Sequence, residues 1–159
     1  MQAFPHVYSV AAAGAQKGSV SLTAAGLPRL MSAAPAEFDG PGDQWSPESL
    51  LCAAVAGCFV LSFRAIARAS GLKWTRLECE VEGTLERSAG VTRFTKIVTR
   101  AVLAVPESVV TSICEKVLHK AEESCLVANS LNCDRELQME IARVPTLEPV
   151  SAQGTAAMT

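Results

Sequence analysis

The sequence has little charge and few aromatic side chains. Asp, Glu, Lys and Arg make up 19% of the 159 residues, and the aromatic residues are two Trp, one Tyr and five Phe. The net charge is −2, with no basic stripe and no run of like charge. Nothing here would attract phosphate or an anionic membrane, so we expect no nucleic-acid partner. A hydrophobic content of 49% excludes intrinsic disorder for the body of the chain.

The sequence also has no hydrophobic run long enough to span a bilayer. The longest uncharged apolar run, Leu50–Phe63, has 14 residues, whereas a transmembrane helix needs about 20. The first ten residues lack the charged start and the continuous apolar segment of a signal peptide. We therefore expect a cytoplasmic protein without a membrane partner, in which the six cysteines are kept reduced.

Motifs for binding a metal are missing as well. No C-x-x-C occurs, and the two histidines, His6 and His119, fall in different expected elements without cysteine or carboxylate neighbours at ligand spacing. We expect no metal site, and a Ser-His hydrolytic triad cannot be located by spacing.

A long helix is the clearest element that is present. Ser46 is a suitable N-cap, Pro47 suits the first helical position, and Glu48 places a carboxylate near the positive end of the helix dipole. The helix is expected to run to Ser70, before Gly71. Its first half is apolar on every side, which predicts a buried helix that a partner subunit covers in part.

Short strands and one further helix are expected around this helix, giving an α+β fold. We expect one domain over residues 1–144 and a disordered tail over residues 145–159. The expected strands are Phe4–Val10, Ser19–Ala24, Leu27–Met31, Trp74–Arg87, Val91–Val105 and Leu137–Ile141, the expected loop is Pro35–Trp45, and the second helix is Glu107–Ser124.

Three of the six cysteines show no sign of a chemical function: two are expected in the core, and the third has no assigned role. Cys79 lies on the apolar face of an alternating strand, and Cys114 lies beside the apolar stripe of the second helix. Both are expected to act as small core residues. Cys133 lies in the turn before the last strand, and its role stays open.

Helix geometry argues against two cysteine pairs. Cys52 and Cys58 are six residues apart, about 240° round the helix and roughly 9 Å along it. Cys114 and Cys125 are about 16 Å apart if the second helix runs through both. A disulfide needs Cα atoms within about 7 Å, so neither pair can form a bridge. Composition alone would make Cys58 and Cys125 structural too.

Two segments resemble the OsmC/Ohr family of thiol peroxidases. The segment Trp45–Phe59 reads WSPESLLCAAVAGCF, and Ser124–Leu131 reads SCLVANSL. The order of long helix, hairpin and second helix is similar as well, so the resemblance covers roughly Val7–Arg143. It implies an OsmC/Ohr-like fold with antiparallel sheets around long buried central helices, in an intertwined homodimer.

The resemblance implies reduction of organic hydroperoxides by cysteine chemistry. Cys58 would be the peroxidatic residue, Cys125 the resolving residue, and an external dithiol such as dihydrolipoamide the reductant, with no bound cofactor. Lys17 and Phe59 are the candidate binding residues. Family peroxidases use an arginine near position 17 to activate the cysteine, and this sequence has Lys17 there instead. Leu126 stands where many relatives have proline.

Glu48 is the expected acidic partner of this site, although a carboxylate in the first turn of a helix is often only a dipole partner. Glu48 and Cys58 are ten residues, about 15 Å, apart on one helix. If both serve one site, that site must combine two subunits, which predicts a homodimer with two composite sites.

Two alternatives remain open. The same fold could serve as a non-catalytic module that binds a small hydrophobic ligand, or senses redox state, at the dimer interface, which the missing arginine favours. It could also be a stress-associated structural dimer without a site. The presence of both cysteines favours the enzyme.

Overall fold

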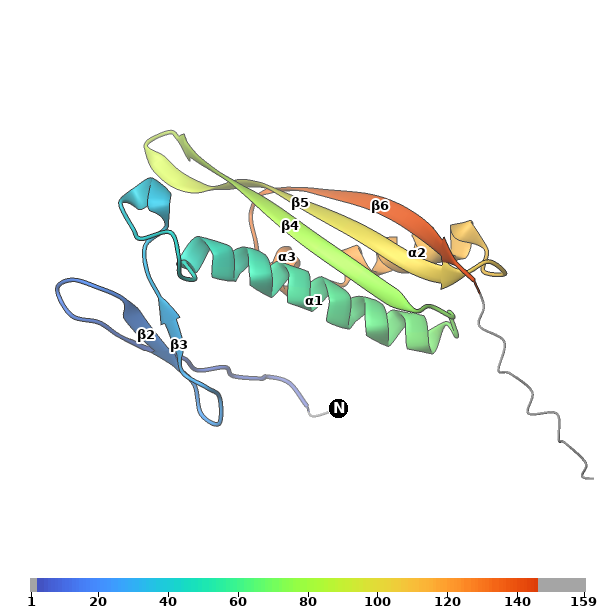
Figure 1. Cartoon of the computed structure of the whole chain (residues 1–159), viewed down its shortest axis with the longest axis horizontal. Coiled ribbons are helices and arrows are strands. Elements are labelled where there is room, and N and C mark those ends of the chain that lie inside the picture. Colours follow the sequence, from blue (N-terminus) through green and yellow to red (C-terminus); the bar gives the residue numbers. More distant parts are fainter. Residues whose placement is uncertain (1–2, 146–159) are drawn as a thin grey trace, which may run out of the picture.

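The computed structural model describes residues 3–145. The chain forms two three-stranded sheets and two long helices, which confirms the α+β class (Figure 1). The N-terminal sheet has the order β1-β2-β3, and the C-terminal sheet has the order β4-β5-β6. The expected tail, residues 146–159, lies outside the described residues.

The C-terminal sheet begins with the expected hairpin. Strands β4 (Arg76–Ser88) and β5 (Val91–Pro106) pair antiparallel across a tight turn, in which Ala89 and Gly90 both have positive φ. Such a turn favours glycine because a Cβ is strained there. On β4 the glutamates face solvent, while Leu77, Cys79 and Val81 pack against the core.

The last strand corrects the expectation of purely antiparallel sheets. Strand β6 (Asp134–Val144) pairs parallel with β5, from Lys96 opposite Asp134 to Pro106 opposite Val144. Helix α2 (Thr111–Glu123) is the crossover between them, which returns the chain in the same direction. Because β6 has this long partner, it extends well beyond the five residues that alternation alone predicted.

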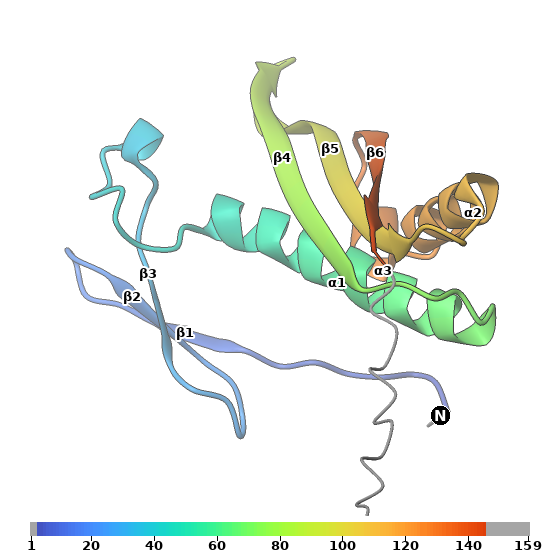
Figure 2. The same ribbon diagram turned by 45° about the vertical axis from the view of Figure 1, so that its right-hand side comes forward.

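Helices α1 (Pro47–Ala69) and α2 pack against one face of this sheet (Figures 1 and 2). Ser46 caps α1 as expected, since its side chain accepts a hydrogen bond from the Ser49 N–H. Phe63 is fully buried and packs edge-on against Trp74, with ring centroids 5.2 Å apart. These contacts make the C-terminal half a packed core.

Within this chain α1 is buried on one face only, and the partner subunit expected to cover the rest of it stays a prediction. One face is buried, but Leu61 on the opposite face is 62% exposed, because one sheet and one helix can cover only one side of α1. Helix α1 has 23 residues and contains an 18-residue window with a mean hydropathy of 2.1, so by length and composition alone it could cross a membrane. Core helices of soluble proteins meet the same criterion, and the absence of a membrane partner stays a prediction. The buried face consists of Val55, Phe59, Phe63 and Ala67.

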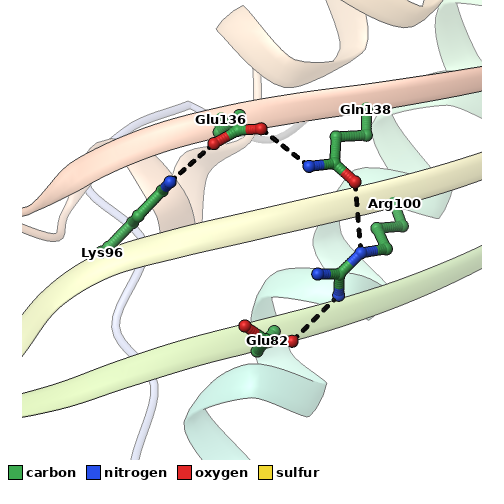
Figure 3. A network of polar contacts seen from close by, with 5 residues as sticks. All are labelled: Glu82, Lys96, Arg100, Glu136 and Gln138. Atoms are coloured by element: carbon green, nitrogen blue, oxygen red, sulfur yellow. Dashed lines mark hydrogen bonds and ion pairs between the residues drawn. The ribbon is translucent and has the colours of Figure 1, made fainter.

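The opposite face of the sheet is polar and open to solvent. Arg100 on β5 reaches Glu82 on β4 at 3.1 Å and Gln138 on β6, and Lys96 pairs with Glu136 at 2.6 Å (Figure 3). These contacts tie the three strands together across their solvent face.

The N-terminal strands are β1 (Ala11–Ala13), β2 (Val20–Thr23) and β3 (Leu30–Ser32). They form a small antiparallel sheet that stands apart from the other one (Figure 2). The expected strand Phe4–Val10 is wrong, since no described strand pairs with it and Phe4, Val7 and Tyr8 are more than 80% exposed. Strand β3 starts later than expected, after Pro28, which lacks an N–H donor.

Two further boundaries differ from expectation. Helix α2 begins at Thr111 rather than Glu107, because β5 continues to Pro106 and Val110 is the extended N-cap. The short helix α3 (Leu126–Asn129) follows Cys125 and was not expected. The expected loop Pro35–Trp45 holds one 3₁₀ turn, η1 (Ala36–Phe38).

Candidate functional site

The structure brings together Cys58 and Cys125, which lie 67 residues apart in the sequence. Cys58 lies midway along α1, and Cys125 is the N-cap of α3, which packs beside α1. The two side chains lie close enough for each to shift the pKa of the other. The Cys125 sulfur also lies 3.8 Å from the carbonyl oxygen of Val55, one turn before Cys58. The two thiols therefore form one cluster at the junction of α1 and α3.

Cys58 opens onto the surface, whereas Cys125 is buried beneath it. Cys58 lines an open depression of about 610 Å³ on the exposed face of α1. The lining is almost entirely apolar, so an organic molecule could rest against the sulfur. The lining residues are Ala54, Gly57, Cys58, Leu61, Ser62, Ala65 and Leu126.

The surroundings of Cys58 favour its thiolate. Partial burial raises the pKa of Cys58, but hydrogen bonds from the Val127 and Leu126 N–H groups, the Cys125 thiol and the Ser62 hydroxyl outweigh this, so that its pKa is lowered overall. Since the thiolate is the nucleophilic form, Cys58 is the reactive thiol of the pair.

Cys125 shows the opposite behaviour. Burial raises the pKa of Cys125, and the neighbouring Cys58 raises it further, while the Ala128 N–H lowers it. Of the two sulfurs, Cys58 therefore loses its proton at the lower pH and Cys125 keeps its proton to the higher pH. In this arrangement the Cys58 sulfur could attack an electrophile while Cys125 stays beside it as a thiol.

Glu48 lies away from this cluster. It is in the first turn of α1, and its Oε2 is buried with no hydrogen-bond partner among residues 3–145. It lines two other cavities, of about 370 and 560 Å³, and not the depression that contains Cys58. The chain alone thus keeps Glu48 and Cys58 apart, as their spacing along one helix requires.

The two expected binding residues are also elsewhere. Lys17 is exposed between β1 and β2 and forms no ion pair within the described part of the chain. Phe59 is 1% exposed and belongs to the core, because one residue beyond Cys58 is about 100° further round the helix. Its place in the packed face corrects the expectation that it lines the site in this chain.

The remaining cysteines lie in other surroundings. Cys114 is fully buried and Cys79 half-buried, and burial raises the pKa of Cys79 to about 11, which fits the core roles expected for both. Cys133 is half-buried against the same core. Burial also raises the pKa of Cys52, which packs close to Gly83, where an added Cβ would lie 2.9 Å from its sulfur. Residues 3–145 contain no group of side chains that could hold a metal ion.

Sequence reasoning missed Ser62 and the backbone N–H groups of Leu126 and Val127. Ser62 had a usable signal, since it follows Cys58 by four residues and therefore shares its helix face. The two N–H groups had none, because α3 has only four residues and no side-chain cap.

Comparisons with known proteins establish the family of the chain. The sequence model for OsmC-like proteins matches residues 40–140, which include α1, both cysteines and most of the C-terminal sheet. The chain belongs to the OsmC-like protein family. Over 109 residues it is 31% identical to the uncharacterized protein YmaD of Bacillus subtilis (strain 168), covering 67% of this chain and 73% of that protein.

Solved structures of OsmC-like proteins share the fold. An OsmC-like protein of unknown function from Vibrio cholerae superimposes with a TM-score of 0.76 at 21% identity, covering 85% of this chain and 99% of that one. The organic hydroperoxide resistance protein OsmC of Legionella pneumophila has a TM-score of 0.69 at 23% identity, covering 86% and 97%. An organic hydroperoxide resistance protein from Elizabethkingia anophelis has a TM-score of 0.72 at 16% identity, covering 90% and 100%.

Proposed function

We propose that this OsmC-like protein is a thiol-dependent peroxidase that reduces organic hydroperoxides. The observation that carries the proposal is the contact between an open, thiolate-favouring Cys58 and a buried, protonated Cys125. The family supports it, because some structural relatives are described as organic hydroperoxide resistance proteins.

The chemistry would take two steps on these sulfurs. The Cys58 thiolate attacks the distal oxygen of R–O–OH, the O–O bond breaks, and the alkoxide takes a proton to leave as the alcohol, with a sulfenic acid on Cys58. The Cys125 sulfur then attacks this sulfenic acid, forming a disulfide and releasing water. The peroxide is reduced by two electrons and the two thiols are oxidised by two.

An external dithiol would complete the cycle. A reductant of the dihydrolipoamide type reopens the bridge by thiol-disulfide exchange, becoming a disulfide itself and returning both cysteines as thiols. Such a cycle needs no bound cofactor. It fits a reducing compartment, and the cytoplasmic location stays a prediction.

The apolar depression bears on the substrate class. Apart from Cys58 and Ser62, its lining residues offer only apolar side chains and backbone. Fatty or aryl hydroperoxides would gain from burying their apolar part there, whereas hydrogen peroxide would not. Organic hydroperoxides are therefore the proposed substrates.

We also propose a homodimer in which Glu48 of one subunit completes the Cys58 site of the other. Apolar side chains that are strongly exposed in the single chain support this, on the N-terminal segment (Tyr8, 88%) and on α1 (Leu61, 62%). The unpartnered buried oxygen of Glu48 also calls for a donor from outside the chain. Sedimentation should give twice the chain mass of 16.7 kDa, and a single-chain mass at micromolar concentration would contradict the dimer.

The test of the peroxidase is consumption of cumene hydroperoxide with excess dihydrolipoamide. The wild type should consume peroxide through many turnovers, and Cys58→Ser should consume none above the background. Cys52→Ser is the matched control, since it lies on the same helix but outside the cluster. If Cys58→Ser keeps the wild-type rate, the enzyme proposal is wrong.

A second candidate function is the binding of a small hydrophobic ligand without turnover. The observation that favours it is the cavity of about 560 Å³ between the N-terminal sheet and the start of α1, lined mainly by apolar side chains such as Val20, Leu22 and Leu50. The same assay separates the two functions, because a pure binding module leaves the peroxide unconsumed in the wild type.

A further inference from the structure

Ser62 lies next to the reactive sulfur on the open face of α1. It follows Cys58 by four residues, about one helical turn, so the two side chains point in the same direction. Both line the depression of about 610 Å³. Any molecule that reaches the Cys58 sulfur therefore also meets the Ser62 hydroxyl.

The hydroxyl of Ser62 is used differently from those of other helical serines in the chain. Ser70 donates to the carbonyl oxygen of Ile66, four residues back, at 2.9 Å, and Ser130 donates to that of Leu126 at 2.9 Å. This back-bonding is the usual fate of a serine hydroxyl in or beside a helix. Ser62 forms no such bond among residues 3–145; its hydroxyl lies beside Cys58 in the same depression and helps to lower the pKa of that thiol.

The donors around the Cys58 sulfur are all uncharged. They are the Val127 and Leu126 N–H groups, the Cys125 thiol and the Ser62 hydroxyl, and no Lys, Arg or His of residues 3–145 lines the depression. A thiolate accepts a hydrogen bond more strongly than a thiol does, so each donor favours the charged form. Ser62 is the one donor here that is neither backbone nor the resolving cysteine.

We propose that Ser62 is a catalytic residue that holds Cys58 as a thiolate, in place of a cation from the same chain. The proposal deepens the peroxidase function and rests on it for its biological meaning. The effect of Ser62 on the thiolate itself, however, can be measured without peroxide.

The experiment is alkylation of Cys58 by iodoacetamide as a function of pH, with the modified peptide quantified by mass spectrometry. In Ser62→Ala the midpoint of the profile should move to higher pH, and the rate at pH 7 should fall about threefold, because Ser62 is the weakest of the four donors and one hydrogen bond contributes a modest net free energy. At high pH, where every thiol is ionised, the two rates should meet. Ser62→Thr keeps the hydroxyl and should restore the wild-type midpoint.

Ser70→Ala is the matched control, because it removes a hydroxyl from the exposed end of the same helix. Its profile should equal that of the wild type. An unchanged midpoint in Ser62→Ala, or an equal shift in Ser70→Ala, would overturn the role of Ser62 while leaving the peroxidase proposal standing. A wild type that shows the low midpoint but consumes no peroxide would instead overturn the peroxidase and keep the effect of Ser62 on the thiolate.

Discussion

The two faces of α1 are both largely apolar but have opposite surroundings. One face, formed by Val55, Phe59, Phe63 and Ala67, is buried against the sheet and α2. The other, which carries Cys58, Leu61 and Ser62, opens onto a depression. The sequence pattern predicts burial for both faces, because the first half of the helix is apolar on every side.

Because of this difference, the packed face of α1 contributes to stability and the open face carries the reactive cysteine. Buried side chains stabilise the fold through the apolar area they remove from water, and they cannot meet a substrate. A cysteine on the packed face should be inert, as we also expect of Cys114, which is fully buried in the same core. The backbone of α1 is held rigid by its packed face, and this fixes the position of Cys58 on the open face.

Phe63→Ala should have the largest effect on stability, because it empties a fully buried site beside Trp74. We expect the free energy of unfolding to fall by about 3–5 kcal/mol. Leu61→Ala, on the open face, should cost less than about 1 kcal/mol at concentrations where the chains are separate. Urea denaturation of the two variants measures both values, and equal costs would remove the distinction between the faces.

Cys125→Ser should have the next largest effect, and it concerns reactivity rather than folding. The Cys58 sulfenic acid should form once and then persist, because its partner for condensation is gone. Dimedone should label Cys58 in this variant after one equivalent of cumene hydroperoxide and leave the wild type almost unlabelled. Labelling of the wild type to the same extent would mean that Cys125 does not resolve Cys58.

Cys58 on the open face and the buried Cys125 should also differ in the pH at which they are alkylated. The pKa of Cys58 is lowered from its ordinary value, so its thiolate should persist to lower pH than the thiolates of the buried cysteines. The pKa of Cys125 is raised, so this sulfur should stay a thiol until higher pH. As the pH rises from 6, iodoacetamide should modify Cys58 first, and peptide mass spectrometry gives the order. Modification of Cys125 first would reverse the assignment.

The smallest effect is expected far from α1, on the solvent face of the sheet. Arg100→Ala removes the contacts to Glu82 and Gln138 (Figure 3), but these side chains are exposed. Its cost should stay below about 1 kcal/mol, and the alkylation profile of Cys58 should not change. Thermal unfolding and the same alkylation assay test this, and a shifted profile would show that the sheet face reaches the site.

Local signals predicted the elements whose determinants lie within the elements themselves. The Ser46 cap, the alternation of β4 and the turn at Gly90 were all readable, because each depends on neighbouring residues. The parallel pairing of β6 was not, since it depends on where the α2 crossover places a distant strand. Phe4–Val10 looked like a strand but has no partner strand among the described residues.

The candidate site was predictable for a different reason. Spacing excluded two cysteine pairs, but only the family resemblance selected Cys58 and Cys125, because their contact joins two elements 67 residues apart. Lys17 and Phe59 failed to reach the depression because one is in a turn of the N-terminal sheet and the other faces the core. Some donors to Cys58 are backbone N–H groups of α3, and the pattern of side chains in a sequence does not predict them.

The most direct test of the central claim is the disulfide formed by one equivalent of cumene hydroperoxide. The reduced wild type is treated, the remaining thiols are blocked, and bridged peptides are mapped by mass spectrometry. We expect a bridge between Cys58 and Cys125, with Cys52, Cys79, Cys114 and Cys133 blocked as free thiols. Oxidation that spares Cys58, or a bridge that excludes Cys125, would contradict it.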